Sequence, residues 1–318
     1  MKRLLAVVAF GLIHVPAYSQ AWPAKPVHVV IPVGAGSSTD IVHRLVLEKL
    51  SLVLGQPVVV ENRTGAGGTI GTAAVAKAEP DGYTLLAHGS AYTIAPALYK
   101  SLPYDAARDL VPVVPVGISP SVLVVAPTKG IKTTQALVSA AKARPGALNF
   151  SSVGIGSATH LSAERFVSSA GIDAVHVPFK GGAEAMTEVV AGRVDFFFGP
   201  VALVLPQIRD GKLLALAVNG AQRSAALPDV QTLLELGYAH AEYPIWYGLF
   251  APAKTPAAIV DRINRATLEA LRAPTLREKL AGLGVDPMAM SADEFKRYVE
   301  HETGLNGTLA KQAGLKAE

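Results

Sequence analysis

The sequence of 318 residues contains no cysteine. This absence excludes disulfide bonds, thiol catalysis and thiolate metal sites. The eight histidines are scattered and form no His-Glu-x-x-His pattern, and no two acidic residues are spaced for general acid–base chemistry. The sequence therefore predicts no metal site, no cofactor and no catalytic residue.

An excess of either charge is also missing. The chain has 29 lysine and arginine residues against 25 aspartate and glutamate residues, and only 17% of its residues are charged. No run of basic residues could follow a phosphate backbone, so nucleic acid is not an expected partner. Half of the residues are apolar, which indicates a compact globular protein that is long enough for two α/β domains.

The first 21 residues form a separate segment. Lys2 and Arg3 provide a basic start, residues 4–13 are apolar, and residues 19–21 offer a small-residue cleavage site. This pattern is typical of a signal peptide that is removed on export. An uncleaved membrane anchor is the alternative, although about ten apolar residues are too few to cross a bilayer.

Short apolar runs alternate with helical segments, as expected for repeated βαβ units. The first helix is expected at residues 39–54, with Ile41, Leu45 and Leu52 as candidates for its buried face. Three valines at residues 58–60 predict a buried parallel strand. The chain is expected to be mainly helical from residue 256. The other expected strands are 27–32, 83–87, 122–126, 149–151, 174–178, 196–198, 213–218 and 245–250, and the other helices are 70–78, 134–143, 159–170 and 183–191.

Glycine and small hydroxyl residues gather where expected strands end and helices begin. Ligands of open α/β sheets bind at this edge, and a helix start offers free N–H groups and a positive dipole end to an anion. The segment at residues 65–69 is not a P-loop, because no lysine follows its glycines. It also lacks the third glycine of the dinucleotide-binding fingerprint, since that position is Ile70. The segments are residues 34–40, 65–69, 151–164 and, in two parts, 177–182 with 192–200.

Two residues of these segments have competing interpretations. Asp40 can cap the first helix, which satisfies N–H groups in its first turn, or it can hold an ordered water or a polar group of a ligand. His160 follows Ser157 by three residues and could form a Ser–His nucleophile pair. No Gly-x-Ser-x-Gly elbow is present, so a structural imidazole that joins the helix start to its neighbours is favoured.

The run VVVENRTGAGGTIG at residues 58–71, followed by VAKAEPDGYTLL at residues 75–86, resembles the signature of one family. That family comprises the Bug-type receptors of tripartite tricarboxylate transporters. The similarity continues in the same order through a Gly-x-Gly-Ser-x-x-His-Leu motif at residues 154–161 and through residues 205–218 and 247–252. It implies an α/β fold of the type II periplasmic binding protein class, with a ligand cleft between two domains.

The resemblance also implies the domain boundaries and the role. Residues 22–120 and 245–318 would form the first domain, and residues 121–244 the second. Such a receptor is expected in the periplasm, where it works as a monomer. It captures a small organic anion, a carboxylate, and delivers it to the permease subunits of the membrane transporter. It is not expected to be an enzyme.

The ligand-binding residues implied by the resemblance come from the glycine-rich segments and from the loop that follows residue 87. Ser37 stands where the family has a second glycine, Phe179 stands where it often has tyrosine, and Pro200 is a third departure. All three lie in the loops that should select among ligands, so the sequence does not identify the acid. The expected residues are Gly36, Ser37, Ser38, Thr39, Asp40, Gly67, Gly68, Ser90, Ser152, Gly156, Ser157, Ala158, Thr159, His160, Gly199 and Pro200.

Two other functions remain open at this point. The same cleft residues could serve a sensor subunit whose liganded form docks on a signalling receptor. A hydrolase that uses Ser157 and His160 is the third hypothesis.

Overall fold

The computed structural model describes residues 22–312, 314 and 315. The predicted signal peptide, residues 1–21, lies outside the described residues. Within the described range, none of the helices is both long enough and apolar enough to span a membrane.

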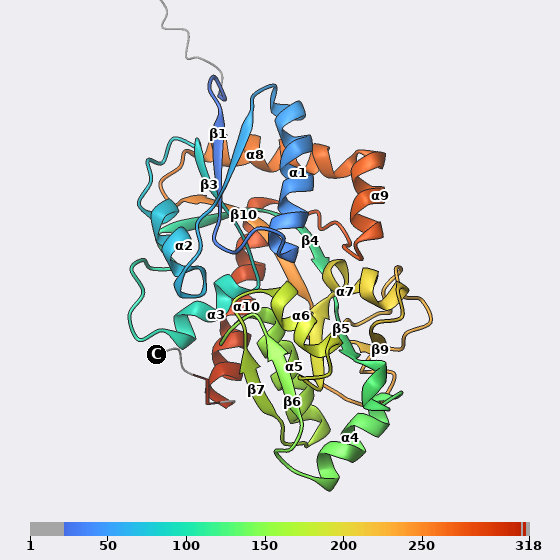
Figure 1. Cartoon of the computed structure of the whole chain (residues 1–318). Coiled ribbons are helices and arrows are strands. Elements are labelled where there is room, and N and C mark those ends of the chain that lie inside the picture. Colours follow the sequence, from blue (N-terminus) through green and yellow to red (C-terminus); the bar gives the residue numbers. More distant parts are fainter. Residues whose placement is uncertain (1–21, 313, 316–318) are drawn as a thin grey trace, which may run out of the picture.

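Two five-stranded sheets organise the chain (Figure 1). The first sheet has the order β2 (Val58–Asn62), β1 (Val27–Ile31), β3 (Thr84–Gly89), β10 (Ile245–Pro252) and β4 (Leu110–Ser119). β1 pairs in parallel with β2 and β3, whereas β10 runs antiparallel between β3 and β4. The first sheet therefore unites strands from both ends of the described chain.

The second sheet repeats this pattern with strands from the middle of the chain. Its order is β7 (Val175–Pro178), β6 (Asn149–Ser152), β8 (Phe196–Pro200), β5 (Ser121–Val125) and β9 (Leu214–Val218). β6 pairs in parallel with β7 and β8, and β5 runs antiparallel between β8 and β9. In both sheets one antiparallel strand thus lies next to a parallel group.

Helices cover both faces of each sheet, because the central strands are apolar on both sides. The core of the first sheet lies under α1 (Ser38–Leu54), α8 (Ala257–Arg272) and α9 (Pro274–Gly282) on one face, and under α2 (Thr69–Ala76), α3 (Ala91–Leu98) and α10 (Ala292–Gln312) on the other. The core of the second sheet lies under α4 (Thr134–Ala143) and α5 (Ala158–Ala170), and under α6 (Gly182–Val190) and α7 (Val201–Arg209). The predicted α/β class is confirmed.

The chain crosses between the two sheets twice, and the side chain of Asn219 is hydrogen-bonded to both crossing segments. Pro120 alone separates β4 from β5, and the return runs through Tyr243 into β10. Asn219, at the end of β9, is fully buried. Its Oδ1 accepts from the Ser121 N–H at 2.6 Å, and its Nδ2 donates to the Tyr243 carbonyl at 2.9 Å and to Ser162 Oγ of α5 at 3.0 Å. The domain boundaries at residues 121 and 245 remain our prediction, and this distribution of strands supports it.

The sequence pattern did not predict β4, α3 or α7, and each of these elements contains proline. β4 contains Pro112 and Pro115, which argue against an interior strand; it forms an edge of the sheet, where proline is tolerated. α3 contains Pro96 and α7 contains Pro206. Because proline lacks an N–H and usually ends a helix, it obscured both short helices in the sequence.

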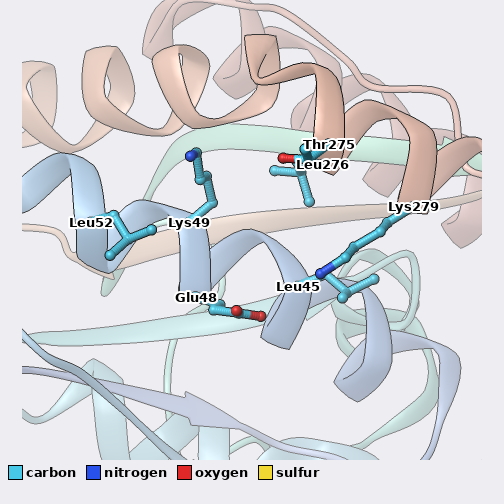
Figure 2. A pocket seen from close by; sticks show the side chains of 7 residues that line it. All are labelled: Leu45, Glu48, Lys49, Leu52, Thr275, Leu276 and Lys279. Atoms are coloured by element: carbon cyan, nitrogen blue, oxygen red, sulfur yellow. The ribbon is translucent and has the colours of Figure 1, made fainter.

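Two predictions about burial are wrong. Val59 is 44% exposed, because β2 is an edge strand and not a central one. Leu52 is 71% exposed, since α1 turns a different stripe of side chains, among them Val42, Val46 and Leu50, to the core. Leu52 instead lines a shallow hollow between α1 and α9 (Figure 2), whose other lining residues are Leu45, Glu48, Lys49, Thr275, Leu276 and Lys279.

Candidate functional site

The start of α1 is shaped by a reciprocal cap. Ser37 is the N-cap residue, and its Oγ accepts from the Asp40 N–H at 3.3 Å. The Asp40 carboxylate reaches back and accepts from the Gly36 N–H at 2.9 Å. Two N–H groups that would otherwise lack partners are therefore satisfied by side chains, as in a capping box.

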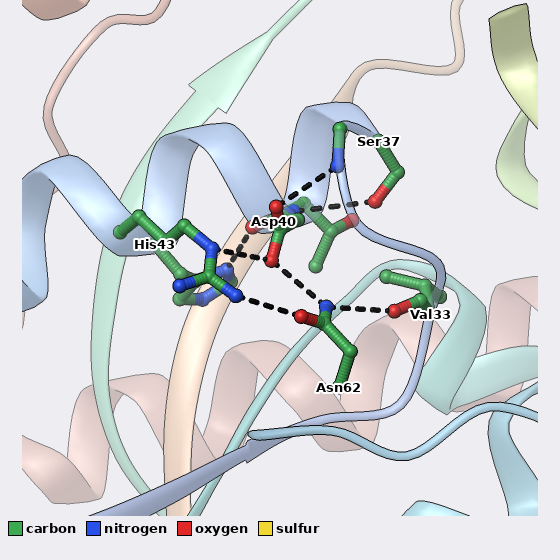
Figure 3. A network of polar contacts seen from close by, with 8 residues as sticks. Val33, Ser37, Asp40, His43 and Asn62 are labelled. Carbon is green, nitrogen blue, oxygen red and sulfur yellow. Dashed lines mark hydrogen bonds and ion pairs between the residues drawn. The ribbon is translucent and has the colours of Figure 1, made fainter. Parts of the chain in front are cut away.

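Asp40 also fastens the helix start to the neighbouring strand end (Figure 3). Its Oδ1 accepts from Arg44 Nε and from Asn62 Nδ2, each at 2.8 Å, and Asn62 Nδ2 also donates to the Val33 carbonyl at 3.0 Å. Burial alone would raise the pKa of Asp40, but the hydrogen bonds from Asn62, Gly36 and Arg44 outweigh it and hold the pKa below its usual value. These contacts give Asp40 the capping role, and a direct contact with a ligand remains a prediction.

The start of α5 repeats the geometry of the start of α1. Gly156 has φ +74° and Gly36 has φ +77°. Ser157 Oγ accepts from the His160 N–H at 3.3 Å, and His160 Nδ1 accepts from the Gly156 N–H at 3.0 Å. The two stretches, GAGSSTD at residues 34–40 and GIGSATH at residues 154–160, share the glycines, the N-cap serine and the threonine. Each sheet thus presents a helix start of the same shape, with histidine in place of aspartate in the second.

The His160 ring is part of a buried aromatic stack that holds the second loop. It lies 3.8 Å from the His176 ring, centroid to centroid, at an interplanar angle of 12°, and Phe150 stacks on both. His160 Nε2 lies 3.3 Å from Glu164 Oε1, and His176 Nε2 lies 2.6 Å from Ser152 Oγ. Burial, with a smaller contribution from His160, lowers the pKa of His176 to about 3. Nothing in the sequence pairs His176 with this loop, because the contact forms only across β6 and β7.

Ser157 and His160 do not form the predicted nucleophile pair. Ser157 Oγ contacts the backbone N–H of His160 and Thr159 Oγ1, at 3.3 and 3.1 Å. Both ring nitrogens of His160 are occupied by Gly156 and Glu164. The hydrolase hypothesis therefore loses the contact on which it depended.

The first two N–H groups of α1 and α5 are the free donors of the site. They belong to Ser38 and Thr39 in α1, and to Ala158 and Thr159 in α5. The first residues of a helix have no carbonyl one turn earlier to bond, and no other described residue accepts from these four groups. Ala158 and Val33, from the loop before α1, pack against the same core cluster. The start of α5 therefore packs against the core of the first sheet.

The remaining predicted residues are placed less directly. Gly68 packs against Pro32, the residue after β1, and against His88, whereas Gly67 lies beside the Tyr99 hydroxyl. Ser90 is buried, and its Oγ accepts from the Trp246 N–H at 2.9 Å. Gly199 and Pro200 are buried in β8, and a Cβ on Gly199 would lie 2.3 Å from Val204 Cγ1. Close packing accounts for Gly199, and the contact of these five residues with a ligand remains a prediction.

Replacing Gly156 with alanine should destabilise the protein more than the same change at Gly36. Both glycines have the same left-handed backbone, which costs alanine about 1 kcal/mol. A Cβ on Gly156 would also lie 1.7 Å from Leu98 Cδ1 of α3, whereas a Cβ on Gly36 meets nothing within 4 Å. We expect losses of about 2 and about 1 kcal/mol, respectively, in urea denaturation. Equal losses of unfolding free energy in the two variants would mean that the contact with Leu98 does not affect stability.

Two α/β layers with matching strand orders and matched helix starts define the class of type II periplasmic solute-binding proteins. Residues 42–315 match the family described as tripartite tricarboxylate transporter family receptor. The chain belongs to this family, and the resemblance that its motifs carry is confirmed. Proteins of the family are solute receptors and not enzymes.

Individual relatives match over almost their whole length. The chain is 37% identical to protein BugT of Bordetella pertussis over 322 residues, which covers 99% of each chain. The solved periplasmic binding protein BugD has a TM-score of 0.86 and 33% identity, over 93% of this chain and 100% of that chain. A Rhodopseudomonas palustris protein solved with adipate has a TM-score of 0.88 and 31% identity, over 93% and 99%.

Proposed function

We propose that this receptor holds a carboxylate of a small organic acid between the starts of α1 and α5. The observation that carries the proposal is the matched pair of capped helix starts, one on each sheet, each with two free N–H groups. A helix start carries about half a positive charge, so two of them offset about one carboxylate. The relative bound to adipate, an acid with a carboxylate at each end, supports a dicarboxylate as the ligand.

Neutral donors are central to this proposal. Arg44, a cation beside the first loop, is paired with Asp40 at 2.8 Å. The Glu164 carboxylate beside the second loop faces His160. Recognition would therefore rest on N–H groups and hydroxyls, which suits an anion that must later be released.

Location and partners complete the proposal. Receptors of the family are periplasmic binding proteins, and the signal peptide predicted at residues 1–21 would direct export. We expect a monomer that carries its acid to the permease subunits of a tripartite tricarboxylate transporter. Light scattering tests the monomer, and loss of acid uptake in cells that lack the receptor gene tests the delivery.

The proposed ligand class is tested by thermal shift of the protein without residues 1–21. The panel contains succinate, glutarate, adipate, malate and citrate, with butyrate and benzoate as monocarboxylates. An acid at 100 times its Kd should stabilise the protein by about 2.7 kcal/mol. Titration calorimetry then ranks the hits. A folded protein that binds no acid of the panel, and that releases none on denaturation, would contradict the proposal.

Replacing Ala158 with proline tests the helix start itself. Ala158 is the first residue of α5, where proline is favoured and removes only an N–H that the helix does not use. Ser157 before it has φ −66° and ψ 158°, which proline permits. We expect binding to weaken by roughly 10- to 100-fold through loss of one charge-assisted hydrogen bond.

The matched control is Ala158→Ser, which keeps the N–H and copies Ser38 of the first loop. It should bind the acid as the unchanged protein does. Unchanged affinity in a folded Ala158→Pro variant would remove the α5 start from the site.

A further inference from the structure

His43 lies in the second turn of α1 and was not among the predicted site residues. It follows Asp40 by three residues (Figure 3), and its side chain is fully buried. Its Nδ1 lies 2.7 Å from the Thr39 carbonyl oxygen, and its Nε2 lies 3.2 Å from the Gly248 carbonyl oxygen of β10. Both ring nitrogens therefore face oxygens that can only accept a hydrogen bond.

A neutral imidazole cannot satisfy both of these contacts, because it has one N–H and one nitrogen with a lone pair. We assign the N–H to the shorter contact, with Thr39, so the lone pair of Nε2 faces the Gly248 oxygen and repels it. An imidazolium would donate to both carbonyls, but burial opposes its charge and lowers the pKa of His43 to about 4. In the ligand-free protein the ring is therefore neutral and lacks one hydrogen bond.

Two other buried histidines near the helix starts are arranged differently. His88 Nδ1 accepts from the Gly89 N–H at 2.8 Å, and His160 Nδ1 accepts from the Gly156 N–H at 3.0 Å. Each of these rings needs its lone pair, so a second proton would break an existing hydrogen bond. In His43 a second proton would complete one. Of these three rings, His43 is the one whose contacts favour the charged form.

Three titratable groups among the described residues face the His43 ring. The Asp40 carboxylate favours a charge on the ring, but it is paired with Arg44 at 2.8 Å. His88 of β3 is neutral, because burial, with a smaller contribution from His43, lowers its pKa to about 3. The Tyr247 ring of β10 meets the His43 ring edge-on at 6.0 Å, and burial raises the pKa of Tyr247 to about 12. A further negative charge is therefore needed to favour the imidazolium.

We infer that His43 is a proton-binding site that is linked to the acid site. When the carboxylate binds at the N–H groups of Ser38 and Thr39, Nε2 of His43 takes up one proton from the solvent, and the new N–H donates to the Gly248 carbonyl. The imidazolium offsets negative charge of the acid without touching it. The inference rests on the proposed function, since it needs an acid at the start of α1. A dicarboxylate carries a second negative charge, which the two helix starts alone do not offset.

Thr39 connects the acid to the ring. Its N–H is one of the free donors at the start of α1, and its carbonyl is bonded to His43. One residue thus separates the proposed carboxylate from the imidazole, and opposite charges attract strongly where water is excluded. Binding of the acid and binding of the proton must then favour each other by the same factor.

The first test is titration calorimetry of the protein without residues 1–21 at pH 6.0, with adipate or with the panel acid that binds more tightly. The heat of binding is measured in phosphate and in Bis-Tris, which differ in ionisation enthalpy, so the difference gives the number of protons taken up. We expect roughly 0.5 to 1 proton per bound acid, after correction for the titration of the acid itself. The absence of net uptake would overturn the inference without the need for any variant.

His43→Gln tests the assignment to this ring. Glutamine keeps an N–H donor but cannot take up a proton at this pH, so the uptake should fall to nearly zero. The affinity of the unchanged protein relative to this variant should rise roughly tenfold between pH 7.5 and 5.5. That change is expected if the acid returns the pKa of His43 from about 4 to the usual 6.5. Proton uptake that persists in the folded variant would overturn the inference.

His28→Gln is the matched control. His28 is an exposed histidine of β1, so this variant should take up as many protons on binding as the unchanged protein does. A loss of uptake in His28→Gln would overturn the assignment to His43. An unchanged protein that binds no acid would instead refute the proposed function, and with it the inference.

Discussion

Replacing Asp40 with alanine should lower the free energy of unfolding by about 3 kcal/mol, as measured by urea denaturation. The carboxylate is 3% exposed and accepts from Gly36, Arg44 and Asn62 at 2.8–2.9 Å. Its removal leaves the Gly36 N–H without an acceptor and takes from Asn62 one of its two acceptors. Because the same contacts shape the loop before α1, we expect the affinity for the bound acid to fall as well.

Two control variants show which property of Asp40 contributes to the free energy of unfolding. One keeps the shape of the side chain but removes its charge, and the other breaks an exposed ion pair elsewhere in the protein. Asp40→Asn keeps an acceptor for the Gly36 N–H but loses the ion pair with Arg44, so we expect about half of the loss. Asp210 pairs with Lys212 at 3.2 Å, and both side chains are more than half exposed. Asp210→Ala should cost less than about 1 kcal/mol. An Asp40→Ala variant as stable as Asp210→Ala would show that the network carries no weight.

Lowering the pH from 7.5 to 5.0 should reduce the free energy of unfolding by about 4 kcal/mol through His43 and His88, and by up to about 2 kcal/mol more through the half-buried His176, whose pKa is lowered to about 3. Burial, opposed by smaller contributions from hydrogen bonds and Asp40, lowers the pKa of His43 to about 4. Burial, with a smaller contribution from His43, lowers the pKa of His88 to about 3. Both values lie below the usual 6.5, so the unfolded chain binds more protons than the folded protein across this range. The contribution of these histidines to stability is therefore complete above pH 6.5 and is lost as the pH falls towards 3.

The measurement is urea denaturation at both pH values and constant ionic strength. In His88→Asn one of the three histidines with a lowered pKa is gone, so the loss between pH 7.5 and 5.0 should be smaller by about 2 kcal/mol. Asp40 does not contribute to the change in stability between pH 7.5 and 5.0. Its pKa is lowered in the folded protein, so its contribution to the free energy of unfolding is complete above pH 3.8 and is lost only below that value. Stability that is constant down to pH 5.0 would mean that the buried histidines are charged in the folded protein.

Local patterns of the sequence predicted most elements of the fold. α4 occupies the predicted residues 134–143 without any shift, and α1 and α5 begin one residue before their predicted starts. The strongest of these signals is a glycine followed by an N-cap serine, because the residues that cap a helix lie within a few positions of its first turn. The starts of α1 and α5 therefore fall inside the predicted segments 34–40 and 151–164.

Contacts between distant segments could not be predicted. Asn62 joins Asp40 from the end of β2, and His176 stacks on His160 from β7. Each contact depends on how strands align in a sheet, and a single sequence carries no record of that alignment. The family resemblance supplied the class of protein, and its motifs include Asn62, but it assigned no role in the site to Asn62 or His176.

The five hydrogen bonds of Asn219 have a mechanical consequence. Besides its three side-chain bonds, its backbone N–H donates to the Ser121 carbonyl at 2.9 Å and its carbonyl accepts from the Tyr243 N–H at 3.1 Å. Because both connecting segments are hydrogen-bonded to one buried residue, we expect them to move together. Ser162 of α5 is bonded to the same residue. We therefore expect any rotation of one sheet relative to the other to be centred near Asn219 and to change the position of the start of α5 relative to the first sheet.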